Sequence, residues 1–99
     1  MRIYHIVLIK FKPGKTHRMA ELAADLAKLR KVLPGFLSCT GGPYASPEGL
    51  NDGYTHGFVM TFVDAATRDR YLTHPDHEKI KAEHIPDLAG VIAFDFEGE

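Results

Sequence analysis

The sequence predicts an α+β protein of the ferredoxin-like kind, in which the order β-α-β-β-α-β builds one four-stranded antiparallel sheet with helices on one face. Two observations lead to this prediction. Four segments are rich in β-branched and aromatic residues, and two longer segments carry apolar residues at helical spacing. The strands are expected at residues 2–12, 36–40, 54–63 and 91–96, and the helices at residues 16–33 and 64–88. A chain of 99 residues accommodates one such domain, spanning residues 1–99.

The first strand, Arg2 to Lys12, carries apolar residues on both of its faces. Because side chains alternate along a strand, one face groups His5 with Ile3, Val7, Ile9 and Phe11, and the other groups Tyr4, Ile6 and Leu8. A strand that is apolar on both faces needs cover on both sides. We therefore expect it at the centre of the sheet.

The first helix is expected to begin with Thr16 as its N-cap and to run to about Leu33, before Pro34-Gly35. A short strand at residues 36–40 follows, at an edge of the sheet, and then a loop rich in glycine and proline. The apolar positions of the helix recur at i, i+3, i+4 and i+7 and are Met19, Leu22, Ala23, Leu26, Leu29 and Leu33.

The stretch from Gly53 to Ile80 runs from a strand into a helix that a proline interrupts. Thr73-His74-Pro75 ends the first part of this helix, since a residue before proline disfavours the helical region, and Pro75 can open a second part. Tyr71 and His77 therefore flank the break. The inward positions of the second part are expected to be Ile80, His84 and Leu88.

The charge balance argues against two classes of partner. Lys and Arg total 12 against 13 Asp and Glu, a net charge of -1, so no field favours nucleic acid or an anionic membrane. No apolar run approaches the roughly 18 residues that a membrane span needs. Cys39 is the single cysteine and no basic-then-apolar leader opens the sequence, which predicts a reducing cytoplasm.

The face of the sheet away from the helices is also expected to be apolar. A soluble monomer rarely leaves so large an apolar patch in water. We therefore expect a homodimer in which two sheets pair face to face. The residues that form this second face include Tyr4, Ile6, Leu8, Val59 and Ile92.

Five segments carry a resemblance to a known family, and together they extend over nearly the whole chain. They are HIVLIKFK at 5–12, LPG at 33–35, GYTHGFVMTF at 53–62, YLTHPDH at 71–77 and FDF at 94–96. With these segments the sequence resembles the stress-responsive dimeric α+β barrel proteins, a family that includes plant stress-induced proteins and olivetolic acid cyclase. The resemblance implies a dimeric barrel, whereas it implies no single activity, since most members have no assigned reaction.

The likeness to the cyclase implies roles for five residues. Its catalytic tyrosine and histidine fall on Tyr71 and His77. Its supporting polar residues fall on His5, His56 and Asp95.

Each of the two catalytic candidates has a functional and a structural interpretation. His77 would lie in the first turn after Pro75, where the positive end of the helix dipole disfavours imidazolium and leaves a neutral ring able to act as a general base. The structural alternative is a helix-terminal histidine that is hydrogen-bonded to the backbone. Tyr71 either donates its phenol hydrogen to a substrate carbonyl or anchors the edge of the core.

The supporting residues are placed by topology. The first and last strands are antiparallel neighbours in this fold, so His5 and Asp95 are expected to meet. Asp95 then orients either His5 or His77, or it forms a structural ion pair at the end of the sheet. His56 is expected away from His5, in a structural role.

A ligand pocket is expected between the sheet and the first helix. No cofactor is expected, because Gly41-Gly42 does not introduce a helix and so makes no phosphate-binding loop. No metal is expected either, since His74 and His77 have suitable spacing but are interrupted by a proline and lack a third ligand. The residues expected to line the pocket are Val7, Ile9, Leu22, Ala23, Leu26 and Phe58.

Two functions from different classes remain open. The first is a stress-associated homodimer that binds a small apolar or aromatic molecule without transforming it, which ranks first because the family pattern establishes a fold before an activity. The alternative is a cofactor-independent cyclase or lyase that removes a proton next to a carbonyl, or a related monooxygenase.

Overall fold

The computed structural model describes residues 1–99 and has the predicted order of strands and helices. The strands are β1 (Arg2–Phe11), β2 (Phe36–Pro43), β3 (His56–Phe62) and β4 (Leu88–Gly98). The helices are α1 (Met19–Val32), α2 (Ala65–Thr73) and α3 (Pro75–His84), with short 3-10 turns at Thr16–Arg18 and Ile85–Asp87. The ferredoxin-like α+β fold is confirmed.

The four strands form one antiparallel sheet in the order β2-β3-β1-β4. The central position predicted for the first strand is confirmed, because β1 pairs with β3 on one side and with β4 on the other. The register places His5 opposite Met60 on β3 and opposite Asp95 on β4. The predicted meeting of His5 and Asp95 is therefore confirmed.

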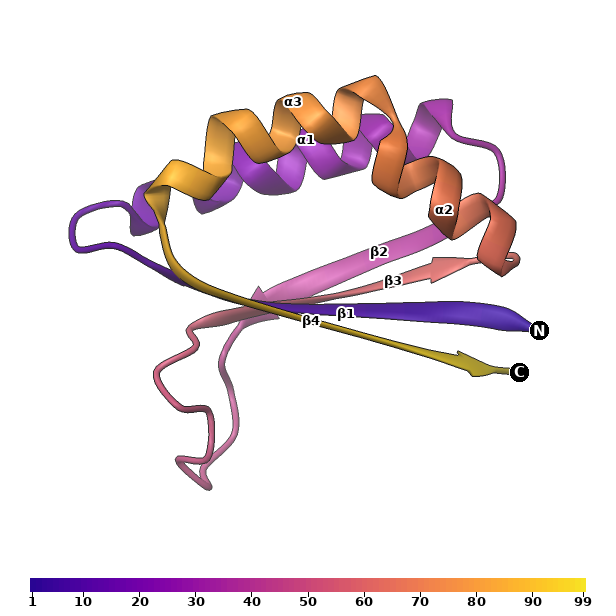
Figure 1. Ribbon diagram of the computed structural model, residues 1–99. Helices are drawn as coiled ribbons and strands as arrows, with labels where there is room; N and C mark the ends of the chain where they lie inside the picture. The colour runs from indigo at the N-terminus through magenta and orange to yellow at the C-terminus, as the bar shows by residue number, and fades with distance from the viewer.

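The helices cover one face of the sheet (Figure 1), where α1 and α3 lie beside each other and α2 lies toward the end that carries both termini. Burial of their apolar sides against the sheet is the main stabilising contribution of this layer. None of the helices has the length and apolar character needed to cross a membrane. The buried apolar side chains of this layer are Ile3, Ile9, Leu22, Leu26, Leu29, Leu33, Phe36, Phe58, Met60, Phe62 and Tyr71.

The start of the first helix differs from the prediction. Thr16 lies in a 3-10 turn, no side chain caps α1, and α1 begins only at Met19. Arg18 holds this region, because its guanidinium lies 3.0 Å from Asp87 and 2.8 Å from Glu83 and also pairs with Glu21. An ion-pair cluster to distant segments replaces the local cap that the sequence suggested.

The break at Pro75 is confirmed and has a specific cap. His74 separates α2 from α3, and its Nδ1 accepts a hydrogen bond from the Asp76 backbone N–H at 3.0 Å. Pro75 occupies the first turn of α3, where its missing N–H removes no helical hydrogen bond. The two helices thus leave the break in different directions (Figure 1).

The outer face of the sheet is apolar and carries no helix. Ile6 pairs with Val59 on one side and with Phe94 on the other, and the rings of Tyr4 and Phe96 stack with centroids 5.0 Å apart. The large exposed side chains of this face are Leu8, Val59, Ile92, Phe94 and Phe96, of which Phe94 is the most exposed at 63%. A second surface is needed to remove this patch from water.

Candidate functional site

A cavity of about 170 Å³, open to solvent on the side where Val91 and Ala93 are exposed, lies between the helix-facing side of the sheet and helices α1 and α3. It follows β1 from His5 to Ile9 and reaches β4 at Val91 and Ala93, and 12 of its 15 lining residues are hydrophobic. A mostly apolar lining with few polar groups is characteristic of small-molecule sites. Five of the residues predicted from the sequence line this cavity: Val7, Ile9, Leu22, Leu26 and Phe58.

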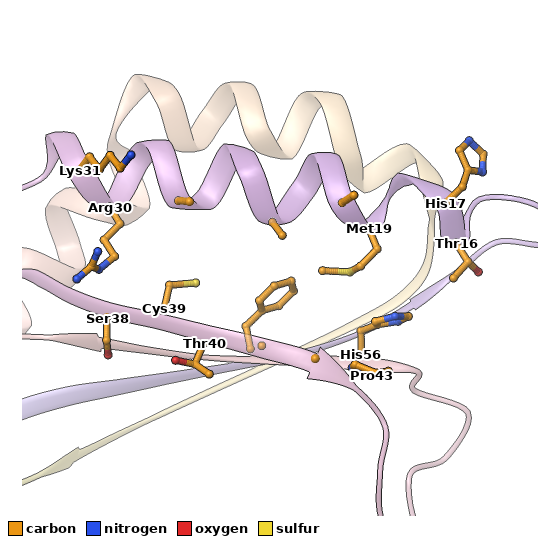
Figure 2. Close-up of a pocket in the computed structure, with 16 residues that line it drawn as sticks. Thr16, His17, Met19, Arg30, Lys31, Ser38, Cys39, Thr40, Pro43 and His56 are labelled. Carbon is orange, nitrogen blue, oxygen red and sulfur yellow. The ribbon is translucent and has the colours of Figure 1, made fainter.

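Ala23 does not line the cavity, and its predicted position needs correction. It is exposed and belongs to a separate open groove between α1 and β2, which Figure 2 shows with Met19 and Cys39 between helix and strand. The reason is helical geometry, since Ala23 lies about 100° around the helix from Leu22. Leu22 and Leu26 point at the sheet, and Ala23 points toward its edge.

Tyr71 occupies one end of the cavity. It comes from the last turns of α2, is 2% exposed, and its ring packs edge-on to His5 with centroids 5.8 Å apart. Burial raises the pKa of the Tyr71 phenol well above its usual value, so the hydroxyl keeps its hydrogen. The group is suited to donate a hydrogen bond to a bound ligand.

His77 lies against the ring of Tyr71 but does not itself line the cavity. The two ring centroids are 4.3 Å apart, and the His77 Nδ1–H donates to the Leu72 carbonyl at 3.2 Å. Burial lowers the pKa of His77, and the bond to Leu72 opposes this only in part. The neutral ring therefore holds its hydrogen on Nδ1 and leaves Nε2 as an acceptor.

His5 and Asp95 form a hydrogen-bonded pair beside Tyr71. His5 is buried and lines the cavity, and its Nδ1–H donates to Asp95, whose other carboxylate oxygen accepts from Arg68 at 2.9 Å. Burial acts to raise the pKa of Asp95, but the hydrogen bonds from His5 and Arg68 outweigh it, so the pKa is lowered. The carboxylate is bonded to His5 rather than to His77.

His56 lies at the other end of the sheet. It pairs with Ile9 in the register, four residues along β1 from His5, and its ring packs edge-on to Phe11 with centroids 5.6 Å apart. Its Nδ1 lies 2.9 Å from the Thr55 hydroxyl. Figure 2 shows it beside Pro43 at the end of the outer groove, so the structure does not bring it to Tyr71.

Three groups suited to proton transfer thus lie together, two of them (Tyr71 and His5) in the cavity lining and His77 behind Tyr71. Tyr71 supplies a hydrogen-bond donor, His77 a neutral ring, and His5 an imidazole whose tautomer Asp95 fixes. No group of three or more histidine, cysteine or acidic side chains is arranged to hold a metal ion. The chemistry open to these residues is hydrogen bonding to a carbonyl and movement of a proton next to it.

Residues 3–98 match the stress-responsive A/B barrel domain. The chain belongs to this family. A stress-response A/B barrel domain-containing protein of Arabidopsis thaliana, HS1, is 28% identical over 95 residues, which cover 95% of this chain and 87% of that protein. Olivetolic acid cyclase of Cannabis sativa is 27% identical over 78 residues, which cover 78% of this chain and 77% of the cyclase.

The barrel fold also has close solved counterparts. The crystal structure of a dimeric ferredoxin-like protein of unknown function from Jannaschia sp. CCS1 superposes with a TM-score of 0.91 at 29% identity, covering 99% of this chain and all of that one. The similarity in structure therefore extends over the whole barrel domain.

Two residues of this A/B barrel domain have polar roles in or beside the cavity that the sequence did not predict. Arg68 lies three residues before Tyr71 on α2 and forms an ion pair with Asp95. The only sequence signal for this role was its position on the same helix as the candidate tyrosine. His84 was predicted as an inward residue but not as a polar group of the site. It lines the cavity near its far end.

The lowered pKa of His77 predicts a pH-dependent stability of the barrel domain. The unfolded chain takes up the proton near the ordinary pKa of about 6.5, whereas the folded protein resists it, so the free energy of unfolding falls as pH drops below about 6.5. We expect His77→Asn to reduce this slope in urea unfolding measured from pH 8 to pH 5. An NMR titration of His77 with a midpoint at or above the ordinary value would contradict the prediction.

Proposed function

We propose that residues 1–99 act as one stress-response A/B barrel domain that forms a homodimer and binds a small, mostly apolar molecule inside each subunit. The observation that supports this most directly is the cavity, whose lining is apolar except for a few groups and includes Tyr71. A volume of about 170 Å³ is close to the roughly 150 Å³ of an apolar cavity that holds benzene. A ligand with one aromatic ring or a short alkyl chain fits this space.

The exposed outer face of the sheet supports the homodimer. Its apolar residues are contiguous across three strands, β3, β1 and β4, and the relative from Jannaschia is described as dimeric. Two such faces packed together would remove the patch from water on both subunits.

A reducing compartment such as the cytoplasm is part of the proposal, because Cys39 is single and half-buried.

Filling the cavity tests the binding function. Ala93 lines the cavity beside Val7, its partner in the strand register, so Ala93→Phe should place a ring in the space and raise the dissociation constant of p-cresol by about tenfold or more. Ala23→Phe is the matched control, since it makes the same change in the outer groove. Isothermal titration measures both.

The two variants also distinguish ligand binding in the cavity from ligand binding in the outer groove. If Ala23→Phe weakens binding and Ala93→Phe leaves the affinity unchanged, the ligand site is the groove between α1 and β2 and not the cavity. Absence of binding in the unmodified protein to any small aromatic probe would overturn the proposal itself.

Proton transfer next to a carbonyl is the second candidate function. The arrangement that favours it is the contact of the Tyr71 ring with two imidazoles, His77 at 4.3 Å and His5 at 5.8 Å between centroids. In this scheme the Tyr71 hydroxyl donates to the carbonyl oxygen of the ligand and an imidazole nitrogen removes a proton from the neighbouring carbon. The hydrogen bond to oxygen strengthens as negative charge develops there, so it stabilises the transition state more than the ground state.

This second function agrees with the name of one relative. Olivetolic acid cyclase shares 27% identity with the chain, and the resemblance assigns its catalytic tyrosine and histidine to Tyr71 and His77. The position of His77 behind Tyr71, outside the cavity lining, is what ranks binding before catalysis.

A further inference from the structure

His84 is a second polar position of the cavity, and its hydrogen bonding is incomplete. The side chain is at the C-terminal end of α3, is 3% exposed and lines the cavity. Its Nδ1 is buried and has no hydrogen-bond partner in the protein, which holds for no other buried side-chain nitrogen or oxygen. Leaving such an atom unpaired costs free energy, so an unpaired buried nitrogen at a cavity indicates a missing partner.

The other nitrogen of the ring determines what that partner must be. The Nε2 of His84 lies 2.7 Å from a carboxylate oxygen of Asp25 on α1. An ionised carboxylate only accepts, so Nε2 carries a hydrogen, and in the neutral form of the ring Nδ1 presents a lone pair. The missing partner of that form is a hydrogen-bond donor, and the negative charge of Asp25 behind the ring disfavours an anion.

A single trapped water fits this position poorly. A buried water usually makes two to four hydrogen bonds, whereas the neighbouring lining is apolar and includes Ile80, Ile85 and Leu88. Lys81 also lines the cavity, but its ammonium pairs with Glu78 at 3.0 Å. Among the side chains that line this end of the cavity, His84 is the one with a buried, unpaired nitrogen.

The two polar positions lie at opposite ends of the cavity. His84 follows His77 by seven residues of the same helix, which is about two turns or roughly 10 Å along the axis. Tyr71 and His5 mark the end near the start of α3. His84 marks the end near Ile85 and Leu88, where the chain enters β4.

We propose that Nδ1 of His84 accepts a hydrogen bond from a hydroxyl group of the ligand, and that this contact selects phenols and alcohols over hydrocarbons and acids. The ligand class is a small aryl or alkyl molecule with a hydroxyl at the His84 end and, where it reaches far enough, a carbonyl at the Tyr71 end. This inference rests on the proposed binding function of the cavity. It adds a specificity-determining residue to that cavity.

Three probes of similar shape test the inference by isothermal titration. The intact protein should bind p-cresol about 3- to 10-fold more tightly than toluene, the worth of one neutral hydrogen bond, and more tightly than p-toluate. In His84→Leu the preference for p-cresol over toluene should disappear while toluene binding is retained. Comparing the two probes within each variant cancels any change in cavity shape.

A measurement on the unmodified protein covers the case in which His84→Leu does not fold. The ¹⁵N resonance of His84 Nδ1 should move on addition of p-cresol and stay in place on addition of toluene. Binding of both probes without preference, an unmoved resonance, or tighter binding of p-toluate would overturn the role of His84 and leave the cavity proposal standing. Binding of no probe would instead overturn the cavity function.

Discussion

Ile6→Asp is expected to convert the proposed homodimer into monomers. Light scattering should then give the 11.0 kDa mass of one chain, whereas the proposed dimer of the unmodified protein should give twice that value. Ile6 lies on β1 at the centre of the outer face, between Val59 and Phe94 in the register. Pairing two such faces would bury the new carboxylate among apolar groups.

The size of the effect follows from the symmetry of the contact. A residue in a two-fold interface occurs twice, so each dimer would bury two unpaired carboxylates. One uncompensated buried charge costs about 3 kcal/mol or more, which corresponds to a dissociation constant raised by 100-fold or more. The single subunit is spared most of this cost, because Ile6 is only half-buried within it.

Leu50→Asp is the matched control for this experiment. It introduces the same charge at an apolar side chain that is 81% exposed in the loop between β2 and β3. We expect this variant to remain dimeric. A dimer that survives Ile6→Asp, or an unmodified protein that is monomeric at micromolar concentration, would show that the outer face is not the interface.

The fold was predictable because its signals are local. Apolar residues on both faces identified β1 as central, and the proline after His74 located the break between α2 and α3. The boundary at Thr16 was wrong because the contacts of Arg18 come from Glu83 and Asp87, more than sixty residues away. The spacing of residues within a short segment does not reveal ion pairs with residues that are far away in the sequence.

The β4 strand shows the same limit at the level of the sheet. The sequence suggested residues 91–96, whereas the strand extends from Leu88 to Gly98. Its length is set by the ten residues of β1 that it pairs with, and not by its own composition. Pairing with a long central neighbour extends a strand beyond its apolar segment.

The candidate site was predictable in part. The meeting of His5 and Asp95 followed from topology, and the closeness of Tyr71 and His77 from the break that they flank. The roles of Arg68 and His84 depend on side-chain directions that spacing alone does not give. The choice of Asp95 between two histidines depended on the strand register, which pairs it with His5.

Tyr71→Phe is expected to abolish most of the proposed proton-transfer activity while leaving the fold stable. The exchange of the methyl hydrogens of acetophenone with deuterium, followed by NMR, measures removal of a proton next to a carbonyl without knowledge of the natural substrate. A positioned donor or base is worth about 10²- to 10⁴-fold in rate, so Tyr71→Phe and His77→Ala should each lower the exchange rate by about 100-fold or more.

The stability of Tyr71→Phe separates a chemical role from a packing role. The ring packs against Phe36, Phe62 and His5, and phenylalanine preserves these contacts because it removes only the hydroxyl. The melting temperature should therefore change little. Equal losses of stability and exchange would assign Tyr71 to the core alone.

The identity of the base is decided by a second comparison. His77 holds a hydrogen on Nδ1 through Leu72, and His5 holds one on Nδ1 through Asp95, so in the neutral form of either ring Nε2 is available as an acceptor. If His77 is the base, His77→Ala removes the exchange, and His5→Gln reduces it by a smaller factor. The opposite order would make His5 the base, which its place in the cavity lining permits. Unchanged exchange in all three variants would exclude this chemistry and leave ligand binding as the function, because no other histidine contacts Tyr71.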